Sequence, residues 1–143
     1  MATRAELLAI TERWIEEGWR KGDAGAVLAM YAADFVDLSN PYRDRGTGGD
    51  NVRGIRDLYE AFPDFHAETD DVAIDLETGK VAVRWTATGT HRGEFFGIAP
   101  TGRTIVFHGI EILTIVDGLI VERAGEWDGT EIARQISDGS GDR

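Results

Sequence analysis

Three carboxylates stand in or beside the last apolar stretch of the chain, where acids are unusual. Residues 109–129 read GIEILTIVDGLIVERAGEWDG, with Glu111 inside the first apolar run and Glu126 and Asp128 where the second run ends. A carboxylate in such a place is costly unless it is paired or has a chemical role. A carboxylate in an apolar pocket can take up and return a proton. These three acids are therefore the predicted catalytic residues, although Asp128 could instead cap a helix that starts near Thr130, and Glu111 could lie exposed on a dimer face.

The acids lie on two strands that the sequence joins in a hairpin. Asp117-Gly118 between two apolar runs is a strong signal for a two-residue β-turn. With that turn, cross-strand partners have residue numbers that sum to 235, and Glu111, Glu126 and Asp128 can share one face. A β-bulge would flip the later part of the second strand. The residues on that face would then be Arg123, Gly125 and Trp127.

Helices are predicted upstream of the strands. A capping box at Thr3–Glu6 opens a helix that Gly22-Asp23 ends. A short Ala-rich helix is predicted over 24–33, followed by an extended segment over 35–38. A polar loop is predicted over 39–50. The next helix is predicted over about 51–62 and stops at Pro63. Apolar residues then alternate over 72–76 and 81–85, with Leu76 expected opposite Val81 and Val72 opposite Trp85.

Helices followed by strands favour an α+β fold, with helices packed on one face of an antiparallel sheet. The last hairpin covers 104–116 and 119–127, after a loop over 91–103, and residues 130–136 suit a short closing helix or turn. We expect one domain over residues 1–136 and a polar tail, disordered, at 137–143.

Composition excludes several classes of function. The chain has 143 residues, 42% of them hydrophobic, no cysteine and a net charge of −11. Disulfides, thiolate metal sites and a cysteine nucleophile are excluded, and the charge argues against nucleic acid and anionic membranes as partners. No apolar run approaches the roughly 20 residues of a membrane span, and no signal peptide is recognised, so a cytoplasmic location is expected.

Aromatic residues in several segments predict a pocket for a flat or aromatic small molecule. The predicted lining residues are Phe35, Phe62, Phe95, Phe96, Phe107, Trp85 and Trp127. Asp37 is predicted to be a substrate-positioning residue at the mouth of this pocket or, equally, a turn residue before Ser39-Asn40-Pro41. His66 is expected to reach the pocket.

Other polar residues are expected away from the pocket. His91 should fix its loop by hydrogen bonding, and His108 and Arg84 should face outward, toward a homodimer interface. The three histidines show no metal-ligand spacing, and no metal site is predicted.

Two further motifs carry a resemblance to a known family. Residues 89–102 read G-T-H-x-G-E-x-x-G-I-x-P-T-G, and residues 115–122 read I-V-D-G-x-I-V-E, followed by W-D at 127–128. Over residues 5–136 the chain resembles the SnoaL-like polyketide cyclases, which have the nuclear transport factor fold. The resemblance implies a cone of curved antiparallel sheet, a cystatin-like α+β barrel, capped by N-terminal helices.

The resemblance also implies cofactor-independent acid/base chemistry on an aromatic polyketide. In these cyclases an aspartate on the last strand is the acid/base and a histidine on the preceding strand assists it. Those positions carry Gly125 and Glu111 here, and a family asparagine aligns with Asp37, so the chain departs from the pattern at all three.

Several functions therefore stay open. They are a cyclase-type enzyme of antibiotic biosynthesis, a hydroxylase component, an isomerase, an epoxide hydrolase, or a binding or interaction domain without catalysis. An epoxide hydrolase of this fold needs two carboxylates and an arginine around one water. Glu111 and Asp128 with Arg84 or Arg123 offer those residue types.

Overall fold

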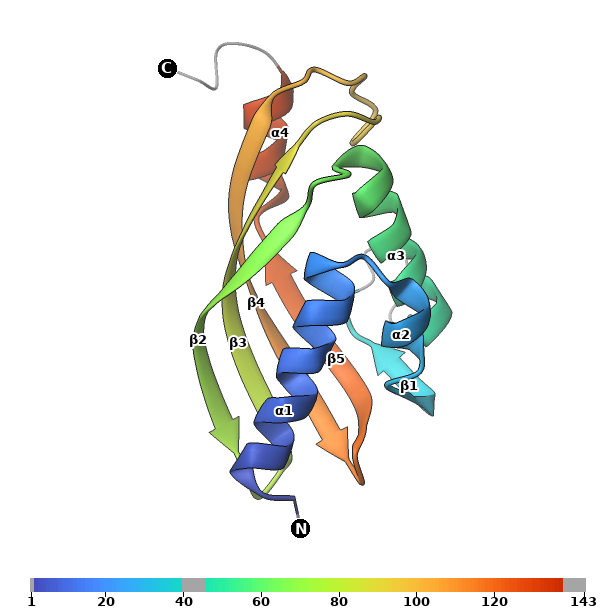
Figure 1. Cartoon of the computed structure of the whole chain (residues 1–143), viewed down its shortest axis with the longest axis vertical. Helices are drawn as coiled ribbons and strands as arrows, with labels where there is room; N and C mark the ends of the chain where they lie inside the picture. Colours follow the sequence, from blue (N-terminus) through green and yellow to red (C-terminus); the bar gives the residue numbers. More distant parts are fainter. Residues whose placement is uncertain (1, 40–45, 138–143) are drawn as a thin grey trace.

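Helices from the first half of the chain form one layer of the molecule (Figure 1). A computed structural model, which describes residues 2–39 and 46–137, gives α1 (Arg4–Trp14), the π-helix η1 (Ile15–Arg20), α2 (Ala24–Leu28) and α3 (Gly48–Ala61). The predicted start of α1 is confirmed, because the Thr3 side chain accepts a hydrogen bond from the Glu6 amide at 3.1 Å.

Two helix boundaries differ from the predictions. α2 ends at Leu28 instead of continuing through Ala33, and the strand β1 (Tyr31–Asp37) starts soon after it. The Ala-rich composition favours helix, but β1 pairs in parallel with a strand of the sheet, and tertiary pairing overrides propensity. α3 starts three residues before the predicted position, because Thr47 and Asp50 form a capping box. Residues 40–45 of the predicted polar loop lie outside the described residues.

The second layer is a curved sheet of five strands in the order β1-β5-β4-β3-β2. The four predicted strands are present as β2 (His66–Asp75), β3 (Lys80–Thr90), β4 (Thr104–Val116) and β5 (Leu119–Trp127), and they pair antiparallel. Figure 1 shows α1, α2 and α3 on one side of this curved sheet. The predicted α+β fold with helices on one face is confirmed.

The hairpin β2–β3 has a different register from the predicted one. Val72 pairs with Val83 instead of Trp85, and Ile74 pairs with Val81. The change is two residues along the strand, so each side chain keeps its face and the apolar face predicted from the alternation remains.

A β-bulge in β5 decides which side chains of the last hairpin face the helices. At the turn the residue numbers of paired residues sum to 235, as in the pairs Val116↔Leu119 and Ile115↔Ile120. The register then shifts, so that Glu111 pairs with Gly125 and Ile110 with Glu126. Val121 is the extra residue. The bulged alternative is therefore correct, and the placement of Glu126 and Asp128 on the face of Glu111 is wrong.

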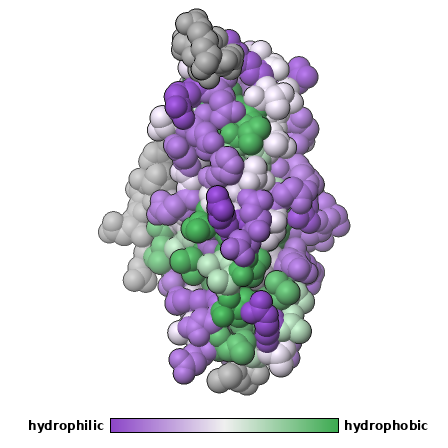
Figure 2. Space-filling model, turned by 90° about the vertical axis from the view of Figure 1, so that its left-hand side faces the viewer, coloured by the Kyte–Doolittle hydropathy of each residue, from purple (hydrophilic) through white to green (hydrophobic). Residues whose placement is uncertain are grey.

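The two faces of the sheet differ in character. Side chains of the inner face, which include Val83, Phe107 and Leu113, are buried against the helices. No element among residues 2–39 and 46–137 forms a layer over the outer face, and Figure 2 shows hydrophobic side chains gathered on its middle and lower part. Ile110 and Ile112 of β4 are 44% and 39% exposed there.

The last helix, α4 (Gly129–Ser137), covers the part of β4 that β5 does not reach. The Gln135 amide donates to the Val106 carbonyl and accepts from the Val106 amide, each at 2.8 Å, so it pairs with this edge as a strand would. The predicted closing helix is confirmed, and residues 138–143 of the predicted tail lie outside the described residues. No helix in the described part of the chain is long and apolar enough to cross a membrane.

Candidate functional site

A cavity of about 420 Å³ lies between the inner face of the sheet and the helices. All four tryptophans of the chain line it, and so do four phenylalanines: Trp14, Trp19, Trp85, Trp127, Phe65, Phe95, Phe96 and Phe107. The polar lining residues are Asp37, Ser39, Asp50, Asn51, Arg53, Asp57, Glu111 and Arg123. The cavity therefore suits a flat hydrophobic molecule with a polar group at one side.

The π-helix explains how two tryptophans of one helix reach the same cavity. Residues five apart in an α-helix lie about 140° apart around the axis. In η1 the Lys21 amide instead donates to the Glu16 carbonyl five residues earlier, at 3.0 Å. Trp14 and Trp19 consequently meet, with ring centroids 5.4 Å apart in a T-shaped arrangement.

One arginine held between two carboxylates forms the polar end of the cavity. Arg123 Nη1 donates to both oxygens of Asp37, at 3.2 and 3.0 Å, and Arg123 Nη2 donates to Glu111 Oε1 at 3.0 Å. The three residues come from β5, β1 and β4, and each is at most 7% exposed. Parallel pairing of β1 with β5 sets Asp37 beside Arg123, and the bulge in β5 turns Arg123 inward.

A chain of hydrogen bonds anchors Asp37 to the helix layer. Asp37 Oδ2 accepts from Asn51 Nδ2 of α3 at 3.0 Å. Asn51 Oδ1 accepts from the Tyr31 hydroxyl at 2.5 Å, and that hydroxyl accepts from Trp14 Nε1 at 3.0 Å. The carboxylate is thus fixed from two sides, which limits its motion.

Glu111 is the carboxyl in this site that is not fully satisfied. Its Oε2 has no hydrogen-bond partner among the described residues, although Glu111 is only 3% exposed. Burial raises the pKa of Glu111 above its usual range, and the Arg123 guanidinium only partly offsets this. Burial acts to lower the pKa of Arg123, but the charges of Glu111 and Asp37 outweigh it and raise that pKa.

The structure brings most of the predicted site residues together. Glu111, Asp37, Trp85, Phe95, Phe107 and Trp127 line the cavity, as does Phe96. Phe62 does not line it and packs behind, with its ring 5.1 Å from that of Phe95. Phe35 is buried in the core, stacked on Tyr31.

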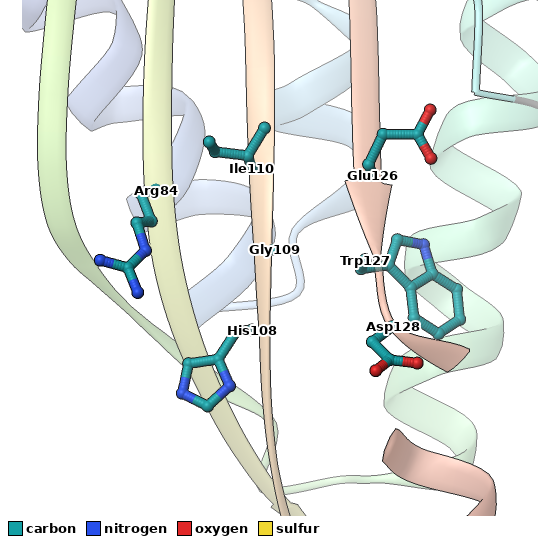
Figure 3. A pocket seen from close by; sticks show the side chains of 7 residues that line it. All are labelled: Arg84, His108, Gly109, Ile110, Glu126, Trp127 and Asp128. Carbon is teal, nitrogen blue, oxygen red and sulfur yellow. The ribbon is translucent and has the colours of Figure 1, made fainter. Parts of the chain in front are cut away.

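Three predicted site residues lie elsewhere. Glu126 and Asp128 line a shallow pocket of about 360 Å³ on the outer face, together with Arg84 and His108 (Figure 3). Asp128 also accepts a hydrogen bond from the Glu131 amide at 3.1 Å and so caps α4. His66 is exposed and contacts Glu68 at 2.5 Å, because it starts β2 outside the cavity.

The remaining predictions concern structural residues. His91 fixes its loop as predicted, because its Nδ1 lies 3.0 Å from Thr101 Oγ1 and its backbone pairs with Arg103 and Gly102. His108 and Arg84 face outward as predicted (Figure 3).

Asn51 and Trp19 line the cavity but are not among the residues predicted to form the site. Arg123 is predicted only as an inward residue of the bulged alternative and as one of two candidate arginines for epoxide hydrolysis, and no local pattern marks a bulge at Val121. The sequence predicts Asn51 only as the start of a helix, and only the strand β1 brings Asp37 to it. Trp19 follows no α-helical stripe, because a π-turn displaces it.

Comparison with known proteins gives the family. The sequence profile of the SnoaL-like polyketide cyclases matches residues 9–136. The chain belongs to this family. Among curated proteins, none matches the sequence.

Solved structures of SnoaL-like proteins share the fold. AclR, a candidate hydroxylase from Streptomyces galilaeus, is 27% identical with a TM-score of 0.85, over 94% of this chain and 83% of AclR. IdmH, a candidate polyketide cyclase from Streptomyces antibioticus, is 25% identical with a TM-score of 0.74, over 92% of this chain and 99% of IdmH. A candidate SnoaL-like polyketide cyclase from Jannaschia sp. CCS1 is 20% identical with a TM-score of 0.82, over 96% of each chain, a likeness that shows the fold alone.

Proposed function

We propose that the protein is a small enzyme of aromatic polyketide or similar secondary metabolism that moves protons with Glu111 and needs no cofactor. The observation that carries this is a buried carboxyl in the lining of a cavity walled by aromatic rings, with one oxygen that accepts no hydrogen bond from the described residues. A raised pKa brings a carboxyl toward neutral pH, where it serves as both base and acid. A cytoplasmic location remains part of the proposal.

The chemistry assigned to Glu111 is a cyclase-type proton transfer. The carboxylate takes a proton from the carbon next to a substrate carbonyl, and the electron pair of the enolate forms a bond to a second carbonyl carbon. The oxygen of that carbonyl then receives the proton from Glu111. Arg123 and Asp37 hold the carboxyl in one orientation throughout.

A test needs no knowledge of the natural substrate. Aromatic 1,3-diketones should quench the fluorescence of the cavity tryptophans and exchange the proton on the central carbon with deuterated water. Glu111→Gln should reduce the exchange to near the uncatalysed rate but keep the binding. Asp128→Asn should leave the exchange unchanged, because Asp128 lies outside the cavity. Loss with Asp128→Asn but not with Glu111→Gln would contradict the proposal.

Epoxide hydrolysis is the second candidate function, favoured by the two carboxylates that flank Arg123. One carboxylate would take a proton from water as the water oxygen attacks an epoxide carbon, and protonated Glu111 would give its proton to the epoxide oxygen. An aryl epoxide in ¹⁸O water distinguishes the two functions, because only a hydrolase yields a labelled diol. Hydroxylation stays a third candidate, since AclR is a candidate hydroxylase.

We also propose that the outer face of the sheet joins two copies of the chain. Three rows of paired residues cross β3, β4 and β5 on this face: Lys80–Thr114–Glu122, Ala82–Ile112–Ala124 and Arg84–Ile110–Glu126. Cations therefore stand on one side of an apolar middle strand and acids on the other. Such a surface is complementary to itself, as a twofold interface requires.

A further inference from the structure

A glycine faces the proposed acid across the strand pair. Glu111 on β4 is the register partner of Gly125 on β5, and directly opposed residues point to the same face. A Cβ at position 125 would overlap Glu111 Oε2, and it would lie 2.7 Å from Glu111 Cδ and 2.8 Å from Arg123 Nη2. The Glu111 carboxyl thus occupies the space that any other residue at 125 would fill.

Space, and not backbone conformation, requires this glycine. Gly125 does not have the left-handed φ that glycines at turns such as Gly79 and Gly118 have. Its extended backbone suits any residue, and glycine inside a strand weakens the strand. A glycine kept there despite that cost is explained by the close approach of the carboxyl and the guanidinium.

We propose that Gly125 is a positioning residue for Glu111, because its missing side chain leaves a compartment against Arg123 that holds one carboxyl. Arg123 Nη2 binds Oε1 on one side of this compartment, and Oε2 lies over the Gly125 backbone. This inference rests on the proposed function, which gives Glu111 its role in proton transfer.

The sheet provides a matched control in Gly109. It also lies on the inner face, and it too lacks a left-handed φ. A Cβ there would overlap Trp85 Cζ2 and lie 2.7 Å from Trp85 Cε2, but none of its three nearest atoms belongs to Glu111. Gly109→Ala therefore reproduces a clash in the same sheet that falls on Trp85 and leaves the space between Gly125 and the Glu111 carboxyl unchanged.

A thermal double-mutant cycle tests the inference. Gly125→Ala should lower the melting temperature of the otherwise native protein and change it little in a Glu111→Ala background. Gly109→Ala should lower it equally in both backgrounds. If Gly125→Ala alone does not fold, Glu111→Ala/Gly125→Ala is still expected to fold. An equal loss from Gly125→Ala in both backgrounds would overturn the inference.

A second measurement separates positioning from packing. The Glu111 carboxyl is followed by ¹³C NMR titration and assigned by its loss in Glu111→Gln. In Gly125→Ala its pKa should differ from that in the native protein, because the carboxyl is pushed out of the compartment, away from Arg123 and toward the cavity. In Gly109→Ala it should stay raised. An unchanged titration in Gly125→Ala would overturn the inference, whatever the activity assays say about Glu111.

Discussion

Arg123 explains why Glu111 and Asp37 can be buried, because it binds both carboxylates. Arg123 neutralises one of the two carboxylates it binds, so the cluster of three buried residues holds one negative charge too many when all are ionised. A proton on Glu111 removes that excess charge, which agrees with its raised pKa. The sequence predicts Glu111 and Asp37 as site residues and offers Arg123 only as an alternative to Arg84, because nothing local shows that Arg123 binds both acids.

Glu111→Gln should separate activity from stability. We expect activity to fall about 10²–10⁴-fold, the usual contribution of general acid–base catalysis. In the native protein, folded Glu111 keeps a proton that the unfolded chain loses above about pH 4.3. Its contribution to stability is therefore complete below that pH and is lost as pH rises through the folded pKa.

The glutamine has no proton to lose, so this decline in the free energy of unfolding should be absent from the variant. The charged or titratable groups around position 111 are common to both proteins: Asp37, Arg123 and Tyr31. Urea unfolding from about pH 4 to about pH 8 makes the comparison. Identical pH dependence in both proteins would show that Glu111 is ionised in the folded state, contrary to the expectation.

Arg123→Met should be strongly destabilising. It leaves Asp37 and Glu111 buried without a countercharge, and breaking such a pair costs about 3–5 kcal/mol. Arg13→Met on the exposed face of α1 is the matched control, and we expect it to change the free energy of unfolding by less than about 0.5 kcal/mol. Denaturant titration measures the free energy of unfolding of both variants. If Arg123→Met loses as little of it as Arg13→Met, water reaches the cluster.

At the level of secondary structure, the sequence predicts the turns, caps and strand alternation that depend on residues close together in the chain. The Asp117-Gly118 turn, the Thr3 cap and the two-residue alternation in β2 and β3 were all readable, because each depends on neighbours in the chain. β1 was read partly as helix, since its pairing with β5 involves residues far apart in sequence. The bulge at Val121 is also set by tertiary pairing, and it alone decides which acids enter the cavity.

The strand pair β4–β5 should accept the acid from either strand. Glu111→Gly should be inactive, and Gly125→Glu should be destabilised by two carboxyls in one compartment. The combined variant Glu111→Gly/Gly125→Glu returns one carboxyl to the same cross-strand pair, within reach of Arg123. We expect it to recover part of the deuterium exchange that Glu111→Gly loses. A folded double variant as inactive as Glu111→Gly would show that the acid must come from β4.

At the level of the whole molecule, the helices cover one face of the sheet and nothing in the described part of the chain covers the other (Figures 1 and 2). Exposed isoleucines on an uncovered sheet support the proposed interface between two copies. A twofold axis parallel to β4 would place Ile110 against its own copy. It would also place Arg84 opposite the partner subunit's Glu126, as their positions on either side of Ile110 suggest (Figure 3).

Charge reversal tests this arrangement. Among the described residues, neither Arg84 nor Glu126 forms an ion pair within its own chain, so both are available to a partner. Arg84→Glu alone and Glu126→Arg alone each place like charges opposite one another, and each should weaken the dimer in sedimentation equilibrium. The double variant Arg84→Glu/Glu126→Arg restores opposite charges with reversed polarity, so it should dimerise nearly as well as the native chain.

Because both residues lie outside the cavity, ligand binding by the three variants should match that of the native protein. Three variants with the same association constant as the native chain would show that the two copies do not meet through this row.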